Sequence, residues 1–267
     1  MGDILKKIIN DNINKLEKQE QNILNKKENK IIQEKIAPIS DKIESMVPDS
    51  LKKTLDVAFY KAFQIVFEKG TKYIEKSYNK EKIQSNHSLN DYKMENNINR
   101  KTLKAMDRHS KTSNIINASL STLEGAGLGL IGMGLPDIPL FTAMILKTIY
   151  EIALSFGFSY ELQDEKIYVL KIIQGALLKG DEQKVCNQHV DELSKKIDNH
   201  IFLDMNLNNE IQRTSDILSD VMLTSKFVQG IPIVGVVGSI TNYTVIKKIS
   251  KYSTIKYKKR YLNNKNI

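Results

Sequence analysis

The sequence predicts an all-α fold, a multi-helix bundle with a glycine-rich apolar helical hairpin at its centre. Three observations lead to this prediction. Apolar residues recur at helical three- and four-residue spacing over most of the chain. An apolar stretch from Gly125 to Gly134 contains five glycines, which let helices approach one another closely. The segment 231–240 is rich in Val and Ile but contains two glycines and a proline, and it has no second strand to pair with, so we expect no sheet.

Two amphipathic helices are predicted in the first part of the chain. The first covers residues 3–35, where Ile and Leu alternate with Lys, Asn and Glu, and its pattern weakens at 25–30. The second carries an apolar stripe over residues 51–74. Asp49 or Ser50 is placed to cap its start.

The first part of the chain ends in a segment typical of a linker. Residues 79–98 are polar and nearly aperiodic. We therefore place the main boundary there. The prediction is an N-terminal amphipathic extension, 1–98, followed by a helical domain, 99–267, that ends in a basic tail.

Further helices are predicted at 100–123, 140–156, 165–178 and, as one or two helices, 181–222. The helix 140–156 is apolar on nearly every face, so it is expected to be buried, in protein or in lipid. Gly157 comes directly after it and predicts its end.

Eight glycines predict two bare helix surfaces that pack against each other. One group lies in the hairpin segment and the other in the apolar run 227–246: Gly125, Gly127, Gly129, Gly132 and Gly134, and Gly230, Gly235 and Gly238. The remaining residues of the hairpin motif are Pro136, Asp137, Pro139, Lys147 and Glu151. Asp137 is placed to cap the helix after it, with Pro139 in its first turn. Lys147 and Glu151 are four residues apart, so they can pair along one helix face.

Neither apolar run is a convincing membrane span. The seventeen residues 140–156 would reach roughly 25 Å as a helix, short of the ~30 Å hydrocarbon core. The run 227–246 is long enough but contains Gln229, Pro232 and Asn242. The two runs therefore fit either the core of a helical protein or a hairpin inserted at a membrane interface, and spanning helices fit them least well.

The positive charge of the chain is concentrated at its C-terminus. The net charge is +9, and the segment 247–267 holds eight basic residues and no acidic one, which leaves 32 basic and 31 acidic residues elsewhere. Because this tail comes after an apolar run, we expect it to contact anionic lipid head groups. Its basic residues are Lys247, Lys248, Lys251, Lys256, Lys258, Lys259, Arg260 and Lys265.

Motifs for other functions are weak or absent. Gly127 to Gly132 matches the dinucleotide pattern GxGxxG, but a predicted helix precedes it and Pro136 interrupts the helix that the pattern requires after it. Cys186 and His189 have the spacing of half a zinc site, and there is no second cysteine. Tyrosines alternate with lysines in the tail, but the rest of the chain offers no basic groove for nucleic acid. We therefore expect no cofactor, no metal and no nucleic-acid partner.

The block from Leu103 to Leu178 resembles the EcsC family of bacterial proteins. The matching features are Asn117, Asp137-Ile138-Pro139, the run Lys147 to Ala153, Phe156-Gly157-Phe158, Asp164-Glu165 and Tyr168-Val169-Leu170. The C-terminal matches are Gln229 to Gly235, Gly238, Asn242 and Arg260-Tyr261-Leu262. The resemblance covers roughly residues 100–262, with Lys147 where Arg is common and Phe156 where Tyr is usual. It implies a bacterial, membrane-related context, because the family's namesake is encoded beside an ATP-binding-cassette transporter linked to protein secretion, and it supplies no catalytic residues.

These observations predict a non-enzymatic helical protein at the cytoplasmic face of the membrane, accessory to a transporter or to protein secretion. The lone cysteine and the lack of a signal peptide fit an intracellular location, and the expected partner is an anionic membrane surface or a membrane protein complex. The alternative is a soluble interaction module whose glycine-rich segments only pack its core. A weaker alternative is a ligand pocket or hydrolase site built around Asp137, Lys147 and Glu151.

Overall fold

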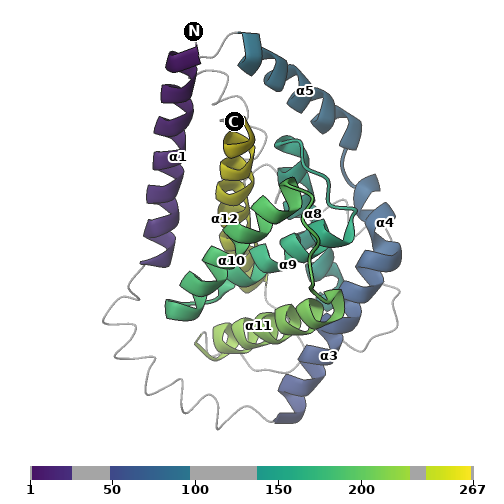
Figure 1. The fold of residues 1–267 in the computed structure, drawn as a ribbon. Coiled ribbons are helices and arrows are strands. Elements are labelled where there is room, and N and C mark those ends of the chain that lie inside the picture. Colours follow the sequence, from purple (N-terminus) through teal and green to yellow (C-terminus); the bar gives the residue numbers. More distant parts are fainter. Residues whose placement is uncertain (1, 26–48, 97–136, 229–238, 266–267) are drawn as a thin grey trace.

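The computed structural model describes residues 2–25, 49–96, 137–228 and 239–265. This part of the chain is helical, and it contains no strand, which confirms the all-α prediction (Figure 1). The helices are α1 (Gly2–Leu24), α3 (Asp49–Ile65), the π-helical turn η1 (Val66–Gly70), α4 (Thr71–Lys76), α5 (Lys80–Asn96), α8 (Asp137–Ser155), α9 (Gln163–Leu177), α10 (Gly180–Asp198), α11 (Leu207–Val228) and α12 (Ser239–Lys265).

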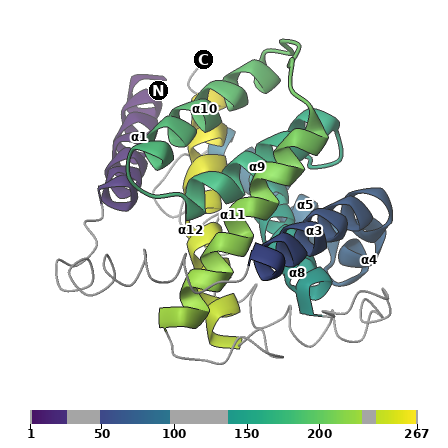
Figure 2. The same ribbon diagram turned by 90° about the horizontal axis from the view of Figure 1, so that it is seen from below.

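Helices α8, α9 and α12 form the centre of the bundle, and each packs against the other helices around it (Figures 1 and 2). α12 lies against α8 and α9, while α9 also contacts α10 and α11. α3 packs on α11 and α8, and α5 covers a further side of α8. α1 lies at the edge of the molecule, along α12.

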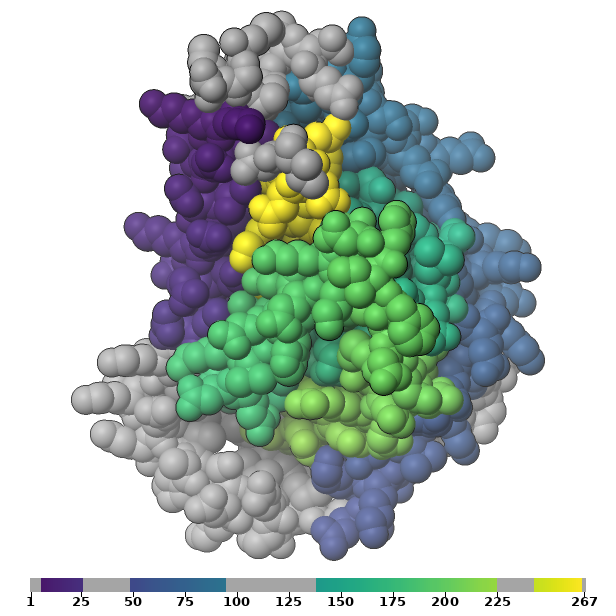
Figure 3. All heavy atoms as spheres, in the orientation of Figure 1, coloured from purple at the N-terminus to yellow at the C-terminus, as the bar shows by residue number. Residues whose placement is uncertain are grey.

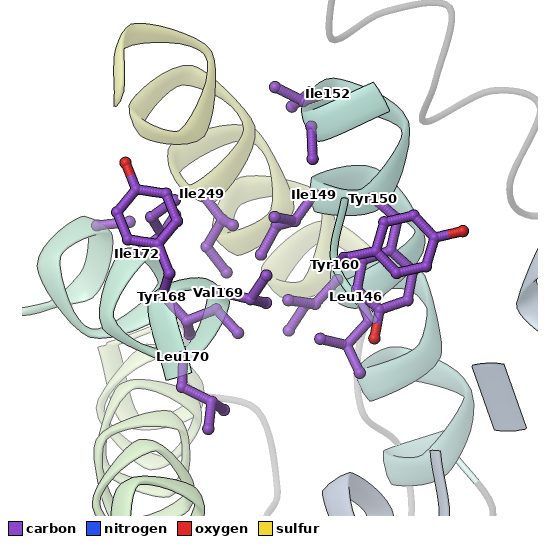
Figure 4. Packing of buried hydrophobic residues seen from close by; sticks show 14 of the residues in the cluster. Leu146, Ile149, Tyr150, Ile152, Tyr160, Tyr168, Val169, Leu170, Ile172 and Ile249 are labelled. Atoms are coloured by element: carbon purple, nitrogen blue, oxygen red, sulfur yellow. The ribbon is translucent and has the colours of Figure 1, made fainter. Parts of the chain in front are cut away.

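The core is built from aliphatic side chains and buried tyrosines (Figure 4). The rings of Tyr150 and Tyr160 stack with centroids 3.9 Å apart. The ring of Tyr257 meets that of Tyr168 edge to face, with centroids 5.4 Å apart. Such ring pairs contribute about 0.5–1.5 kcal/mol each beyond the area that they bury. The chain has no tryptophan, so most ring contacts among the described residues involve only tyrosine and phenylalanine, and His87 adds one edge-to-face contact with Tyr261.

α8 is the most apolar helix of the bundle, and it lies inside the protein. Its segment Ile138–Ser155 is long and apolar enough to cross a membrane by length and composition, but 94% of that segment is buried by the helices around it. Pro139 is buried in the first turn, as predicted, and Gly157 comes just after the helix with a positive φ of 83°. Between the two expected environments, protein or lipid, the structure therefore shows protein around this helix.

The predicted linker is wrong, because most of it is helix α5. α5 buries Asn90 and Met94, although its sequence is polar on nearly all faces. Contacts with neighbouring helices stabilise it. His87 Nδ1 lies 3.2 Å from the carbonyl oxygen of Ser155, and Tyr261 donates a 2.6 Å hydrogen bond to Asp91.

The predicted boundary near residue 98 does not separate two cores. Phe59 and Phe63 of α3 are fully buried in the same cluster as Ile149 of α8 and Ile249 of α12. Several predictions lie outside the described residues: the helix 100–123, the end of the first helix beyond residue 25, and all eight packing glycines.

Candidate functional site

The eight basic residues of the predicted tail lie on one helix, α12, and the structure divides them into two groups. Lys247, Lys248 and Lys251, in the first half of the helix, are exposed. Lys256, Lys258 and Arg260 are buried, and Lys259 and Lys265 are half-buried. Because a lysine or arginine is almost never fully buried without a partner, the second half should be lined by acidic residues from other helices.

Glu20 of α1 and Asp191 of α10 supply two of these carboxylates. Asp191 binds Lys256 at 2.8 Å and Lys259 at 3.1 Å. Glu20 forms ion pairs with the same two lysines, and its distance to Lys259 is 3.1 Å. Two lysines therefore face two carboxylates. For Lys259, burial alone would lower the pKa of the ammonium, but Asp191 and Glu20 outweigh burial and raise the pKa above its ordinary value.

Arg260 holds the ends of two other helices together. Its guanidinium bonds to both carboxylate oxygens of Glu165, at the start of α9, and to both oxygens of Asp198, at the end of α10. The guanidinium carbon also lies 4.2 Å from the centroid of the Phe158 ring. Burial would lower the pKa of Arg260, but the two carboxylates outweigh it and raise the pKa. This planar, two-sided arrangement is one that lysine cannot reproduce.

The expectation of head-group contact is therefore corrected for the second half of α12. Lys256 and Arg260 are bound to carboxylates inside the protein, Lys258 is 7% exposed, and Lys265 binds Asp91 at 2.9 Å. The segment was predicted to be a basic tail because its own sequence contains no acid. The neutralising acids come from α1, α5, α9 and α10, and sequence spacing gave no signal of these contacts.

The three exposed lysines lie in the first half of α12, eight to twelve residues after it begins at Ser239, and we name the end of the bundle where this helix begins the basal end. Here α11 ends and α12 begins, as the lower edge of Figure 2 shows. α8 runs in the same direction as α12. Ile149 and Ile249 meet in the interior (Figure 4), and Phe156 and Tyr261, at the far ends, lie with ring centroids 6.4 Å apart. α8 therefore also begins at the basal end.

An exposed aromatic side chain accompanies these lysines. Tyr243 is 45% exposed, and the ammonium of Lys247 lies 5.9 Å from the centroid of its ring. The two apolar, glycine-rich segments join the described helices at this same end, one before Asp137 and the other between Val228 and Ser239. Basic and aromatic side chains beside apolar segments are the combination found at membrane interfaces.

Lys147 and Glu151 pair within α8, as their spacing predicts, at 2.8 Å. Lys147 is fully buried and Glu151 nearly so. Burial raises the pKa of Glu151, and the ammonium of Lys147 only partly opposes this effect. Asp137 begins the same helix ten residues before Lys147, which is roughly 15 Å along the axis, so the three residues do not form one pocket.

The described residues contain no group of three His, Cys, Asp or Glu side chains that could hold a metal ion. Cys186 is buried, with its sulfur 3.8 Å from the carbonyl oxygen of Lys171. Burial raises the pKa of its thiol. Cys186 is therefore a core residue on α10, with little thiolate character.

Comparison with known proteins gives one result. A model of the EcsC protein family matches residues 10–262, nearly the whole chain. No curated protein and no solved structure matches. The match begins at residue 10, so the predicted extent of the resemblance, residues 100–262, was too short, and α3, α4, α5 and most of α1 lie within the family region.

Proposed function

This chain belongs to the EcsC protein family, and we propose that it is a non-enzymatic helical protein that binds the cytoplasmic face of the cell membrane through its basal end. The observation that carries the proposal is the separation of the basic residues on α12. Lys247, Lys248 and Lys251 are exposed on the half of α12 nearer the basal end, whereas Lys256, Lys259 and Arg260 are bound to carboxylates of other helices.

The buried charges support the non-enzymatic part of the proposal. Lys147, Lys256 and Arg260 are each engaged by carboxylates and lie deep between helices. Removal of the partner would leave a buried, uncompensated cation at a cost of about 3–5 kcal/mol, so these cations are held in structural pairs. An accessory role beside a transporter or in protein secretion is the finer part of the proposal, and it is supported by the family resemblance alone.

The competing function is that of a soluble interaction module, and one observation favours it. α8 satisfies the length and composition of a membrane helix but is almost wholly covered by protein. If the glycine-rich segments likewise only pack against the bundle, the basal end would not bind a membrane, and any partner that it has would be another protein.

Sedimentation of the full chain with lipid vesicles separates the two functions. We expect binding to phosphatidylglycerol–phosphatidylcholine vesicles, weaker binding in high salt, and little binding to pure phosphatidylcholine. The triple variant Lys247→Gln, Lys248→Gln, Lys251→Gln should lose up to about 3 kcal/mol of binding free energy, or about a hundredfold in affinity.

The matched control is Lys18→Gln, Lys195→Gln, Lys196→Gln. These three lysines are exposed on α1 and α10, so the control removes the same charge from elsewhere on the surface. Equal losses for the two triple variants would mean that overall charge, not the basal end, drives adsorption. Full recovery of the wild-type protein in the supernatant at low salt, with and without anionic vesicles, would leave the soluble module as the better account.

A further inference from the structure

We infer that α1 is a releasable cover over a second cationic surface on α12, and that this surface fits anionic lipid head groups once α1 is released. The inference rests on the proposed membrane function and adds its regulation. In Figure 3, α1 lies at the edge of the molecule beside α12, and its main contacts are with α12 and α10.

α1 is attached by few buried groups. Among its described side chains, only Ile9, Leu16 and Glu20 are buried. The central helix α9, by contrast, buries twelve of its 15 residues. Because hydrophobic stabilisation scales with the apolar area removed from water, α1 should be released more easily than the central helices of the bundle.

The buried carboxylate of Glu20 makes the attachment electrostatic. It is 3% exposed and bridges Lys256 and Lys259, which also share Asp191. With α1 in place, the two lysines are balanced by two carboxylates. Without it, two lysines would face the single carboxylate of Asp191, and one positive charge would be uncompensated on the newly exposed face of α12.

The covered surface continues the exposed one. Lys248 and Lys259 are eleven residues apart on α12, which is close to three helical turns, so they project from the same side. Release of α1 would therefore extend the strip of cations from the basal end toward the C-terminal half of the helix. A flat, negatively charged lipid surface matches a strip of this kind, along which each added cation strengthens adsorption.

The test compares Glu20→Gln with Glu17→Gln in the full chain. Both variants remove one negative charge from α1, but Glu17 is exposed, whereas Glu20 is buried against the lysines of α12. In Glu20→Gln we expect amide hydrogen exchange in α1 to rise about tenfold or more, with exchange in α9 unchanged. Binding to phosphatidylglycerol–phosphatidylcholine vesicles should rise about fivefold above Glu17→Gln, the effect of one additional cation. Adding Lys256→Gln and Lys259→Gln to Glu20→Gln should abolish this gain.

Each outcome decides the inference separately from the proposed function. Unchanged exchange in α1 of Glu20→Gln would overturn the inference. So would release of α1 without a gain in vesicle binding over Glu17→Gln, even if the wild-type protein binds. If Glu20→Gln binds anionic vesicles and the wild-type protein does not, the result supports α1 as a cover and overturns the proposed role of the basal end in the resting protein. If neither protein binds, both the inference and the proposed function are overturned.

Discussion

At the scale of single residues, Gly157 shows how one position fixes the path of the chain. It ends α8 with φ at +83°, a conformation that side chains disfavour. A Cβ atom at this position would also lie 2.3 Å from Nε2 of His87 on α5. The sequence predicted this glycine as the end of the helix, because a glycine after a long apolar run is a common termination signal. The close approach of α5 could not be predicted, because it depends on tertiary packing.

The variant Gly157→Ala should therefore be costly for two reasons, and Gly180→Ala provides the comparison. Gly180 has a similar positive φ of 59°, but nothing lies within 4 Å of an added Cβ. We expect Gly180→Ala to lower the free energy of unfolding by about 1–2 kcal/mol from backbone strain alone. Gly157→Ala should lower it by at least a further ~1 kcal/mol from the clash with His87. Urea unfolding measures both, and equal losses would show that α5 does not press on this turn.

The buried charges mark the limit of sequence reasoning at this scale. The pairing of Lys147 with Glu151 was predicted, because both lie on one helix at a spacing that brings them together. The pairing of Arg260 with Glu165 and Asp198 was not, because these residues are far apart in the sequence. Local periodicity gives the face of a helix, and it does not give the helix that this face will meet.

At the scale of elements, α5 is a helix that its own sequence does not predict. It lacks an apolar stripe, so its stability comes from the contacts that it makes with α8 and α12. Asp91 is the centre of the contact with α12, where it accepts hydrogen bonds from Tyr261 and Lys265. α9, by contrast, lies close to the predicted range 165–178, and the region 181–222, predicted as one or two helices, forms the two helices α10 and α11, since amphipathic patterns reflect the core that such helices cover.

The contact between α5 and α12 should weaken in acid. Burial alone would raise the pKa of Asp91, but the bonds from Tyr261 and Lys265 outweigh it and lower the pKa below the ordinary 3.8. A lowered carboxyl pKa stabilises the fold above the unfolded-state value, and this contribution is lost as the pH falls through the folded-state value. Asp91→Asn should therefore destabilise the protein near pH 7, and its difference from wild type in unfolding free energy should shrink toward about pH 3. A difference that is constant over this range would contradict the role of Asp91.

At the scale of the whole molecule, the chain has one core where the sequence predicted a boundary. The segment 79–98 is polar and nearly aperiodic, and it was therefore interpreted as a linker between two parts of the chain. The apolar face of α3, however, packs against α8 and α11, and that of η1 packs against α8. The burial of α8 could be predicted from the sequence, whereas the long helix α12, whose sequence was interpreted as an apolar run and a basic tail, and the arrangement that closes the core could not.

Removal of residues 1–98 should therefore prevent cooperative folding of the remainder. The deletion removes Phe59, Ala62 and Phe63, which are fully buried, and exposes the faces of α8 and α11 that they cover. Loss of two such phenylalanine side chains alone would cost about 3–5 kcal/mol each, comparable with the whole stability of many domains. Deleting only residues 1–24, which contribute few buried groups, should leave a cooperative transition in thermal unfolding monitored by circular dichroism. A sharp transition for 99–267 would show that the second part is an independent domain.

The tyrosines at the centre of the bundle give the protein a built-in optical signal. No tryptophan is present to dominate ultraviolet fluorescence, so emission comes from phenol rings, several of which lie in contact inside the core. Burial raises the pKa of Tyr150, Tyr168 and Tyr257, so these phenols keep their protons in alkali for as long as the helices around them stay together. The absorbance of phenolate in alkaline solution thus records the opening of the core itself, and no dye or engineered label is needed to observe it.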